Sequence, residues 1–167
     1  MVRRLSLWLS CAALLALAGC GFGLRQPANY AFSTLYSSVA PNSPLGVELQ
    51  RQLQAGGELR YLTDSAQLKD AEVLLDVYGE RRTKTVVGLG ATGQVREFQL
   101  RLNLKFRLRT PLGKELIPET ELVQQRTMSY SEAFALSKEV EEAMLYRNMQ
   151  SDMVQQIARR LAAVRKL

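Results

Sequence analysis

Residues 97–109 alternate strictly between polar and apolar side chains, and this run constrains the fold more than any other feature. Apolar residues occupy every even position from Phe98 to Leu108, and polar residues occupy every odd position from Glu97 to Arg109. Successive side chains of a β-strand point to opposite faces, so this period of two buries one face and leaves the other in a polar setting. We therefore predict a long strand in a sheet with one exposed polar face.

Three further segments favour extended structure. Residues 30–36 are rich in aromatic and β-favouring side chains, residues 73–84 begin with an alternating apolar pattern, and residues 122–130 match the pattern more weakly. Pro111-Leu112-Gly113 has the composition of a turn. These signals predict strands before and after the strand at 97–109.

Two segments carry helical periodicity. Leucine recurs every four residues within 44–55, where Ser43 can cap the helix, Pro44 suits its first position and a glycine pair follows its end. The same step runs through the last stretch at Met149, Met153, Ile157 and Leu161. Ser137 is the predicted N-cap of this second helix, with acidic residues after it and basic residues near its end.

The predicted order of elements is β-α-β-β-β-α, which implies an α+β fold. We expect a two-layer sandwich: a mostly antiparallel sheet of about four strands, covered on one face by two helices. The polar side chains of the strand at 97–109 would lie on the opposite, exposed face.

The N-terminus has the layout of an export signal. Arg3 and Arg4 precede an apolar run of about 14 residues, which is too short to cross a bilayer of ~30 Å as a helix. Leu17-Ala18-Gly19-Cys20 then resembles the bacterial lipobox at all four positions. An ordinary signal peptide with a chance cysteine is the alternative.

The lipobox divides the chain into three parts. We expect residues 1–19 to be a cleaved lipoprotein signal peptide, 20–29 to be a lipidated tether and 30–167 to be a single domain. Cys11 would leave with the signal and lipid would occupy Cys20, so no disulfide is possible within the mature chain. Three acyl chains on Cys20 would anchor the protein durably. Gly21 in the next position permits sorting to the outer membrane, by resemblance to other lipoproteins.

Catalytic and cofactor motifs are weak in this sequence. Histidine, the usual general base and commonest metal ligand, does not occur. Residues 88–93 fit the pattern G-x-G-x-x-G, but a nucleotide site needs a helix to follow, and here a strand follows. We expect this segment to be a loop between two strands, and we expect no enzyme activity, no cofactor and no metal site. A lipid-anchored hydrolase based on lysine or carboxylates stays open as an alternative.

Basic side chains gather around the central strand. Without Arg3 and Arg4, 20 basic residues face 16 acidic ones, a net charge of +4. The polar face of the central strand carries Arg101, Lys105, Arg107 and Arg109. The preceding strand carries Arg81, Arg82 and Lys84, and the central strand itself begins with Arg96. A hairpin would bring Arg82 or Lys84 close to Arg96, and arginine forks bind phosphate bidentately. The alternative is that these charges keep a one-sided sheet soluble. An exported protein is not expected to bind nucleic acid.

Taken in order, these segments resemble the lipopolysaccharide-assembly lipoprotein family LptE. The resemblance rests on the order and spacing of four stretches: Ala18 to Arg25, Pro44 to Leu53, Gly93 to Leu100, and the closing helix with Asp152, Gln156, Arg160 and Leu161. It covers essentially the whole mature chain. Members sit in the lumen of the large outer-membrane β-barrel LptD, assist its assembly, plug it and bind lipopolysaccharide.

The resemblance also implies ligand-binding positions. Lys138 matches a basic position at the start of the closing helix. The family's basic loop position falls on Ala91 here, and Arg96 is the candidate to replace it, with Lys84 and Arg82 as further lipopolysaccharide-binding candidates.

We therefore expect an outer-membrane lipoprotein, lipid-anchored on the periplasmic side and housed in the barrel lumen, that binds LptD and lipopolysaccharide. The alternative is a non-catalytic scaffold or chaperone of another envelope complex with no lipid ligand. A spherical mature domain would be roughly 38 Å across. A barrel of ~26 strands has a backbone diameter of roughly 50 Å, which is enough to hold it.

Overall fold

The computed structural model describes residues 29–57 and 59–166. The signal segment, Cys20 and nearly all of the expected tether lie outside these residues. Along the chain the main elements are β1 (Thr34–Ser37), α2 (Pro44–Gln54), β2 (Arg60–Leu62), β3 (Val73–Leu89), β4 (Val95–Arg109), β5 (Glu115–Ser129) and α3 (Ala135–Ala162). Two 3-10 turns, Ser65–Asp70 and Glu132–Phe134, precede β3 and α3.

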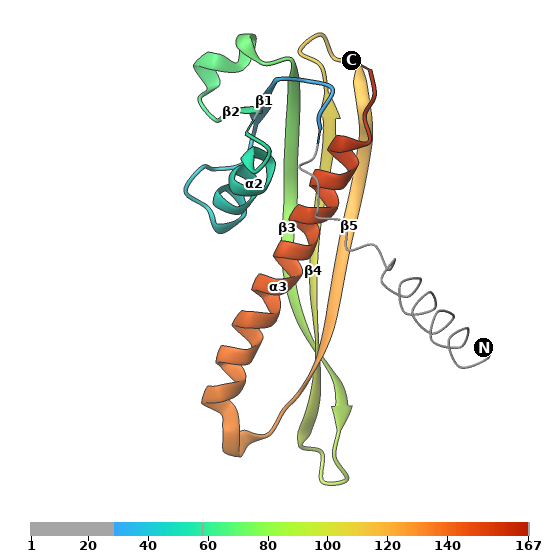
Figure 1. The fold of residues 1–167 in the computed structure, drawn as a ribbon. Helices are drawn as coiled ribbons and strands as arrows, with labels where there is room; N and C mark the ends of the chain where they lie inside the picture. The colour runs from blue at the N-terminus through green and yellow to red at the C-terminus, as the bar shows by residue number, and fades with distance from the viewer. Residues whose placement is uncertain (1–28, 58, 167) are drawn as a thin grey trace, which may run out of the picture.

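The strands form one open, mixed sheet in the order β2-β1-β3-β4-β5 (Figure 1). The long pairs β3–β4 and β4–β5 are antiparallel, as expected, whereas β1 pairs in parallel with both β2 and β3. The sheet therefore has five strands rather than about four. The strand that the sequence did not reveal, β2, has three residues, too few for a period of two to be visible.

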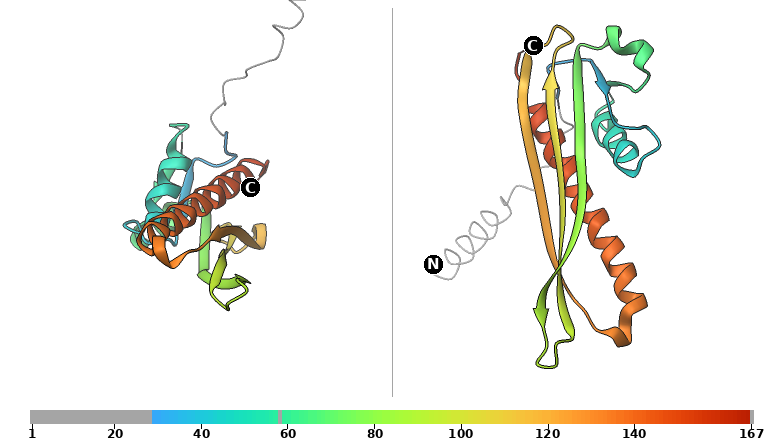
Figure 2. Two further views of the ribbon diagram at one scale, coloured as in Figure 1. Left: turned by 90° about the horizontal axis from the view of Figure 1, so that it is seen from below. Right: turned by 180° about the vertical axis from the view of Figure 1, so that it is seen from behind.

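Both helices cover the same face of the sheet, which confirms the expected two-layer arrangement (Figures 1 and 2). Leu45, Leu49 and Leu53 of α2 join Met149, Met153, Ile157 and Leu161 of α3 in one core. The even-numbered residues of β4 form the floor of this core and are 0–1% exposed from Leu100 to Leu108. The alternation at 97–109 thus has the predicted structural meaning.

The start of one helix was predicted correctly and the start of the other was not. The Ser43 hydroxyl accepts a hydrogen bond from the Gly46 amide at 3.0 Å and caps α2, with Pro44 as its first residue. Ser137 does not cap α3, because this helix begins at Ala135. The Ser137 hydroxyl lies inside the first turn and donates instead to the Phe134 carbonyl at 2.8 Å.

The long strands end at two turns of the same kind. Gly93 donates to the Gly90 carbonyl and Gly113 donates to the Thr110 carbonyl, and both glycines have positive φ, 79° and 89°. Residues 88–93 therefore form the end of β3 and its turn into β4, as expected for a loop between strands. β3 continues to Leu89 and so is longer than the predicted 73–84.

The molecule is elongated rather than spherical (Figure 1). β3 has 17 residues, and at ~3.3 Å per residue it is about 56 Å long. The expected sphere of roughly 38 Å is therefore wrong as a shape, because long antiparallel strands set one dimension of the fold.

A bulge in β3 reverses which side chains face the helices. Tyr78 pairs with Lys105 and Arg81 with Asn103, so Gly79 and Glu80 together oppose one residue of β4. Before the bulge, odd-numbered residues of β3 face the core. After it, Arg82 is opposite Leu102 of the buried face, and the even-numbered residues turn toward α3. Gly79 adopts φ 69°, a conformation that disfavours residues with a Cβ.

We predict that Gly79→Ala lowers the free energy of unfolding by about 1 kcal/mol, through backbone strain. An added Cβ would meet nothing within 4 Å, so packing does not contribute to the loss. Gly79→Asn should cost less, because asparagine tolerates positive φ better. Denaturant unfolding measures both variants, and an Ala variant as stable as the parent would contradict the assignment.

Candidate ligand-binding groove

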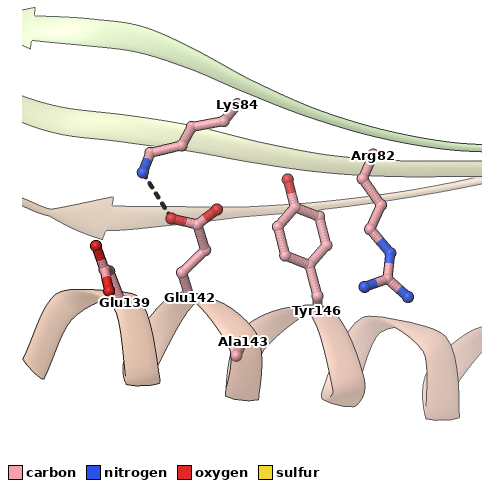
Figure 3. Close-up of a pocket in the computed structure, with 6 residues that line it drawn as sticks. All are labelled: Arg82, Lys84, Glu139, Glu142, Ala143 and Tyr146. Atoms are coloured by element: carbon pink, nitrogen blue, oxygen red, sulfur yellow. Dashed lines mark hydrogen bonds and ion pairs between the residues drawn. The ribbon is translucent and has the colours of Figure 1, made fainter. Parts of the chain in front are cut away.

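A groove of about 600 Å³ lies between β3 and the first half of α3 (Figure 3). The strand contributes the cations of the groove and the helix contributes its carboxylates. The lining residues are Arg82, Lys84, Glu139, Glu142, Ala143 and Tyr146. Two of the predicted ligand-binding residues are thus brought together, but two carboxylates balance their charge.

Lys84 is held by one carboxylate and one ring. Its Nζ lies 2.6 Å from Glu142 Oε2 across the groove and 4.3 Å from the centre of the Phe98 ring (Figure 3). The partners are partly exposed, and ion pairs of this kind contribute about 0–1 kcal/mol. A stronger anion can therefore compete with Glu142 for Lys84.

Arg82 contacts more groups of the protein than Lys84 does. Its guanidinium lies 3.1 Å from Glu80 Oε1 and 3.5 Å from Gln150 Oε1, and 5.4 Å from the centre of the Tyr146 ring. Gln150 in turn donates to Glu48 of α2 at 3.0 Å. Arg82 thus connects β3 with both helices, which is a structural role.

Tyr146 joins the helix to the strand at the groove. Its hydroxyl donates to the Thr83 carbonyl at 2.8 Å. Burial raises the pKa of this phenol, and the nearby Glu142 charge raises the pKa further, while Arg82 opposes the shift. The hydroxyl therefore keeps its proton and remains a donor at neutral pH.

Lys138 and Arg96 lie outside the groove. Lys138 Nζ contacts Glu141 Oε2 at 2.8 Å and Ser129 Oγ at 3.1 Å, and its side chain is 18% exposed. Arg96 is exposed and lines a separate cavity of about 170 Å³ beside Ser131 and Glu132.

The expected meeting of Arg96 with Arg82 or Lys84 is wrong. Lys84 pairs with Leu100, four residues beyond Arg96, and Arg82 pairs with Leu102. At ~3.3 Å per residue these offsets are about 13 and 20 Å along the strand. The hairpin is longer than predicted, so its turn lies farther from the two β3 cations.

These cations nevertheless share one end of the molecule. Phe98, which lies under Lys84, packs edge-on against Tyr130 with ring centres 5.0 Å apart. The Tyr130 amide donates to the Arg96 carbonyl at 2.7 Å, and the neighbouring Ser129 contacts Lys138. The candidate residues named from the sequence therefore lie at one end of the fold, but at separate positions there.

Most predicted cations of the outer sheet face are already paired. Lys105 Nζ lies 2.7 Å from Glu119, and the Nε atoms of Arg107 and Arg109 each lie 2.9 Å from Asp76 Oδ2. Partial burial raises the pKa of Asp76, but hydrogen bonds and charge from the two arginines outweigh it and hold the pKa below its usual value. These cations support the reading of a charge-balanced soluble face.

Sequence reasoning missed the acidic partners and the bulge. Glu142 is one of the acidic residues that follow Ser137, for which the sequence indicated only a place near the start of the helix, yet it holds Lys84. An isolated glycine within a strand pattern indicates a bulge, so Gly79 carried the one signal that could have revealed the reversal of β3.

Residues 29–57 and 59–166 lack two features that would point to other functions. They contain no cluster of three or more metal-ligating side chains, and none of their helices has the length and hydropathy to cross a bilayer.

We predict that Asp76→Asn lowers the free energy of unfolding at pH 7 by up to about 1 kcal/mol. Because the folded-state pKa of Asp76 is lowered, the carboxylate stabilises the fold above its unfolded pKa, and this stabilisation is lost as pH falls through the folded pKa. The difference in free energy of unfolding between parent and variant, measured by urea unfolding, should shrink as the pH is lowered toward about 2. A difference that is constant with pH would contradict the ion pairs with Arg107 and Arg109.

Comparisons with known proteins agree with this fold. Residues 32–161 match the model of a family described as LptE, lipopolysaccharide-assembly. The LPS-assembly lipoprotein LptE of Yersinia pestis (strain Pestoides F) is 30% identical over 165 residues, which cover 97% of this chain and 77% of that protein. The protein of the same name from Yersinia pseudotuberculosis (serotype O:1b, strain IP 31758) gives the same values.

Solved structures of lipoproteins share the architecture. The solution structure of an uncharacterized lipoprotein B from Nitrosomonas europaea has a TM-score of 0.68 and 30% identity, over 86% of this chain and 91% of that one. A minor lipoprotein from Acinetobacter baumannii has a TM-score of 0.63 over 81% and 94% of the two chains, and at 23% identity it supports the fold alone. The family is defined by assembly rather than by a catalysed reaction. The chain belongs to the LptE family of lipopolysaccharide-assembly lipoproteins.

Proposed function

We propose that this chain is an outer-membrane lipoprotein that occupies the lumen of an LptD-type β-barrel, assists its assembly and binds lipopolysaccharide during transport to the cell surface. Membership of the LptE family is the observation that carries the proposal. Residues 1–19 are the cleaved signal, Cys20 carries the acyl chains and residues 20–29 tether the domain that begins at residue 30. No catalytic step is involved.

An uncovered face of α3 supports docking against a partner. α3 has 28 residues and α2 has 11, so α2 packs against only part of α3. Ser151, near the middle of α3, contacts Glu48 of α2. Toward the N-terminus of α3, Leu136, Val140 and Met144 follow at four-residue steps and are 78%, 65% and 48% exposed. We call these three residues the α3 stripe.

The elongated shape also suits a lumen. A domain about 56 Å long, built on antiparallel strands that lie along one axis, can align with the axis of a wide barrel. Such an orientation places the α3 stripe along the barrel wall, where burial of apolar surface stabilises the complex by ~25 cal/mol per Å². This role needs no ligand.

Lipopolysaccharide would bind at the end of the domain that carries Lys84, Lys138 and Arg96. Each of the two lysines exchanges a carboxylate, Glu142 or Glu141, for a phosphate of the ligand. A phosphate bears more charge than a carboxylate and offers three acceptor oxygens, so the exchange is favourable for a partly exposed lysine. Arg82 contributes mainly by keeping β3 and α3 in place.

The charge balance of the groove favours the alternative function, a scaffold of an envelope complex that has no lipid ligand. Its two cations face two carboxylates, so the groove itself has no excess positive charge. A scaffold of an envelope complex, without a lipid ligand, would have the same feature. Measured binding of lipopolysaccharide separates the two functions.

We predict that the combined substitution of Lys84→Gln, Lys138→Gln and Arg96→Gln reduces retention of lipopolysaccharide at least about tenfold, because charge-assisted contacts to phosphate are lost. The matched control replaces three exposed cations elsewhere, Arg51, Lys69 and Lys114, by Gln, for the same change in net charge. Retention is measured by pull-down of lipopolysaccharide with the purified full-length protein in detergent.

Equal retention by the parent and both triple variants would refute the ligand role and leave the scaffold function. An equal loss in both variants would show that net charge alone attracts the lipid, which also contradicts the proposed positions.

A further inference from the structure

Two arginines meet on the sheet face opposite the helices. Beyond the bulge at Gly79, the odd-numbered residues of β3 face outward, and Arg81 pairs with Asn103 while Thr83 pairs with Arg101. Arg81 and Arg101 are therefore diagonal neighbours on one face, about 7–8 Å apart at their Cα atoms. The bulge thus sends Arg82 toward the helices and Arg81 to the outer face.

These two arginines differ from the other cations of the outer face. Lys105, Arg107 and Arg109 each have a carboxylate within 4 Å. Among residues 29–57 and 59–166 the structure gives neither Arg81 nor Arg101 an ion pair or a side-chain hydrogen bond, and both side chains are exposed. Two like charges so placed repel each other, and a shared anion would relieve the repulsion.

The surroundings of the pair are mostly polar. Asn103, opposite Arg81, donates to the Glu121 carboxylate at 3.0 Å, and Val123 on β5 is the exposed apolar neighbour of Asn103. Arg101 is opposite Gln125 on β5, and Gln99 is opposite both Thr85 and Thr127. With Thr83, these residues supply hydroxyl and amide groups, which can donate to and accept from sugar hydroxyls. No helix of the described residues covers this face of the sheet (Figure 2), which leaves it open to a ligand wider than a free ion.

We propose that the outer face around Arg81 and Arg101 binds a phosphate monoester carried on a saccharide, at a site separate from the groove under α3. The two guanidinium groups take the phosphate, each as a bidentate donor, and the Thr and Gln side chains take the sugar. This inference rests on the proposed function, because a phosphorylated glycolipid supplies such a group. In this arrangement the sugar and its phosphate bind to the outer face of the sheet, whereas the phosphates bound by lysines lie on the helix side of the sheet.

Direct binding of small probes tests this site. The full-length lipoprotein in detergent is titrated with glucosamine 1-phosphate, with inorganic phosphate and with glucosamine, at constant ionic strength, and dissociation constants are measured by calorimetry. The test variant carries Arg81→Gln and Arg101→Gln. The control carries Lys105→Gln and Arg107→Gln, which change the charge of the same face equally. Thermal unfolding checks that each variant folds.

We expect glucosamine 1-phosphate to bind the parent more tightly than inorganic phosphate does, and glucosamine not to bind. The test variant should bind the phosphosugar at least tenfold more weakly, and the control within twofold of the parent. The phosphosugar should also raise the unfolding temperature of the parent but not of the test variant, a readout that stays valid if either variant is less stable.

Equal weakening in both double variants would overturn the proposal, because the face would then act only through its overall charge. Hexaglutamate serves as a probe for an acidic protein surface. If it binds the parent as tightly as the phosphosugar does, and binds the Arg81 and Arg101 variant more weakly, the proposal is overturned and the face binds an acidic protein surface instead. Failure of this inference can be distinguished from failure of the proposed function. The proposed function is tested by lipopolysaccharide retention in the triple variant at Lys84, Lys138 and Arg96. Unchanged phosphosugar binding by the Arg81 and Arg101 variant would refute only this inference.

Discussion

The packing of α3 onto the apolar face of β4 is the interaction on which the rest of the structure depends. β4 lies between β3 and β5, and its buried side chains from Leu100 to Leu108 meet Met149, Met153 and Ile157 of the helix in one core. At ~25 cal/mol per Å² of apolar surface, burial of this kind is the dominant stabilising contribution to a small domain. The packing of α3 on β4 also gives the sheet two different faces. One face lies under the helices and borders the groove, and the other is open and polar.

The parts of the fold that were predicted from sequence are those with a long, regular period. The strand at 97–109 and the helix at 44–55 repeat their pattern often enough to fix both type and face. β2 is too short to show any period, and its parallel pairing with β1 depends on contacts distant in sequence. Ser137 fits the composition of a cap, but the preceding 3-10 turn starts α3 three residues earlier than such a cap would.

The candidate site shows the same division. Sequence identified the basic residues that, through a resemblance, are candidates at one end of the molecule, but it could not identify their partners. One bulge at Gly79 decides that Arg82 and Lys84 face α3, and the carboxylates of α3 then neutralise much of their charge. The proposed ligand binding at this end would therefore be an exchange of partners rather than the filling of an empty positive site. Arg81 and Arg101 differ because, among the described residues, no carboxylate of the opposite face forms an ion pair with them.

The central claim, that this domain works inside a large barrel, is tested most directly by purification of the tagged full-length chain from cell envelopes in mild detergent. The account predicts that one large outer-membrane β-barrel purifies with the chain in a 1:1 ratio, and that aspartate at the three positions of the α3 stripe, Leu136, Val140 and Met144, removes it. Aspartate at Val47 and Leu112, which are also exposed but lie elsewhere, should leave the complex intact. Purification of the unaltered chain as a free monomer would contradict the account.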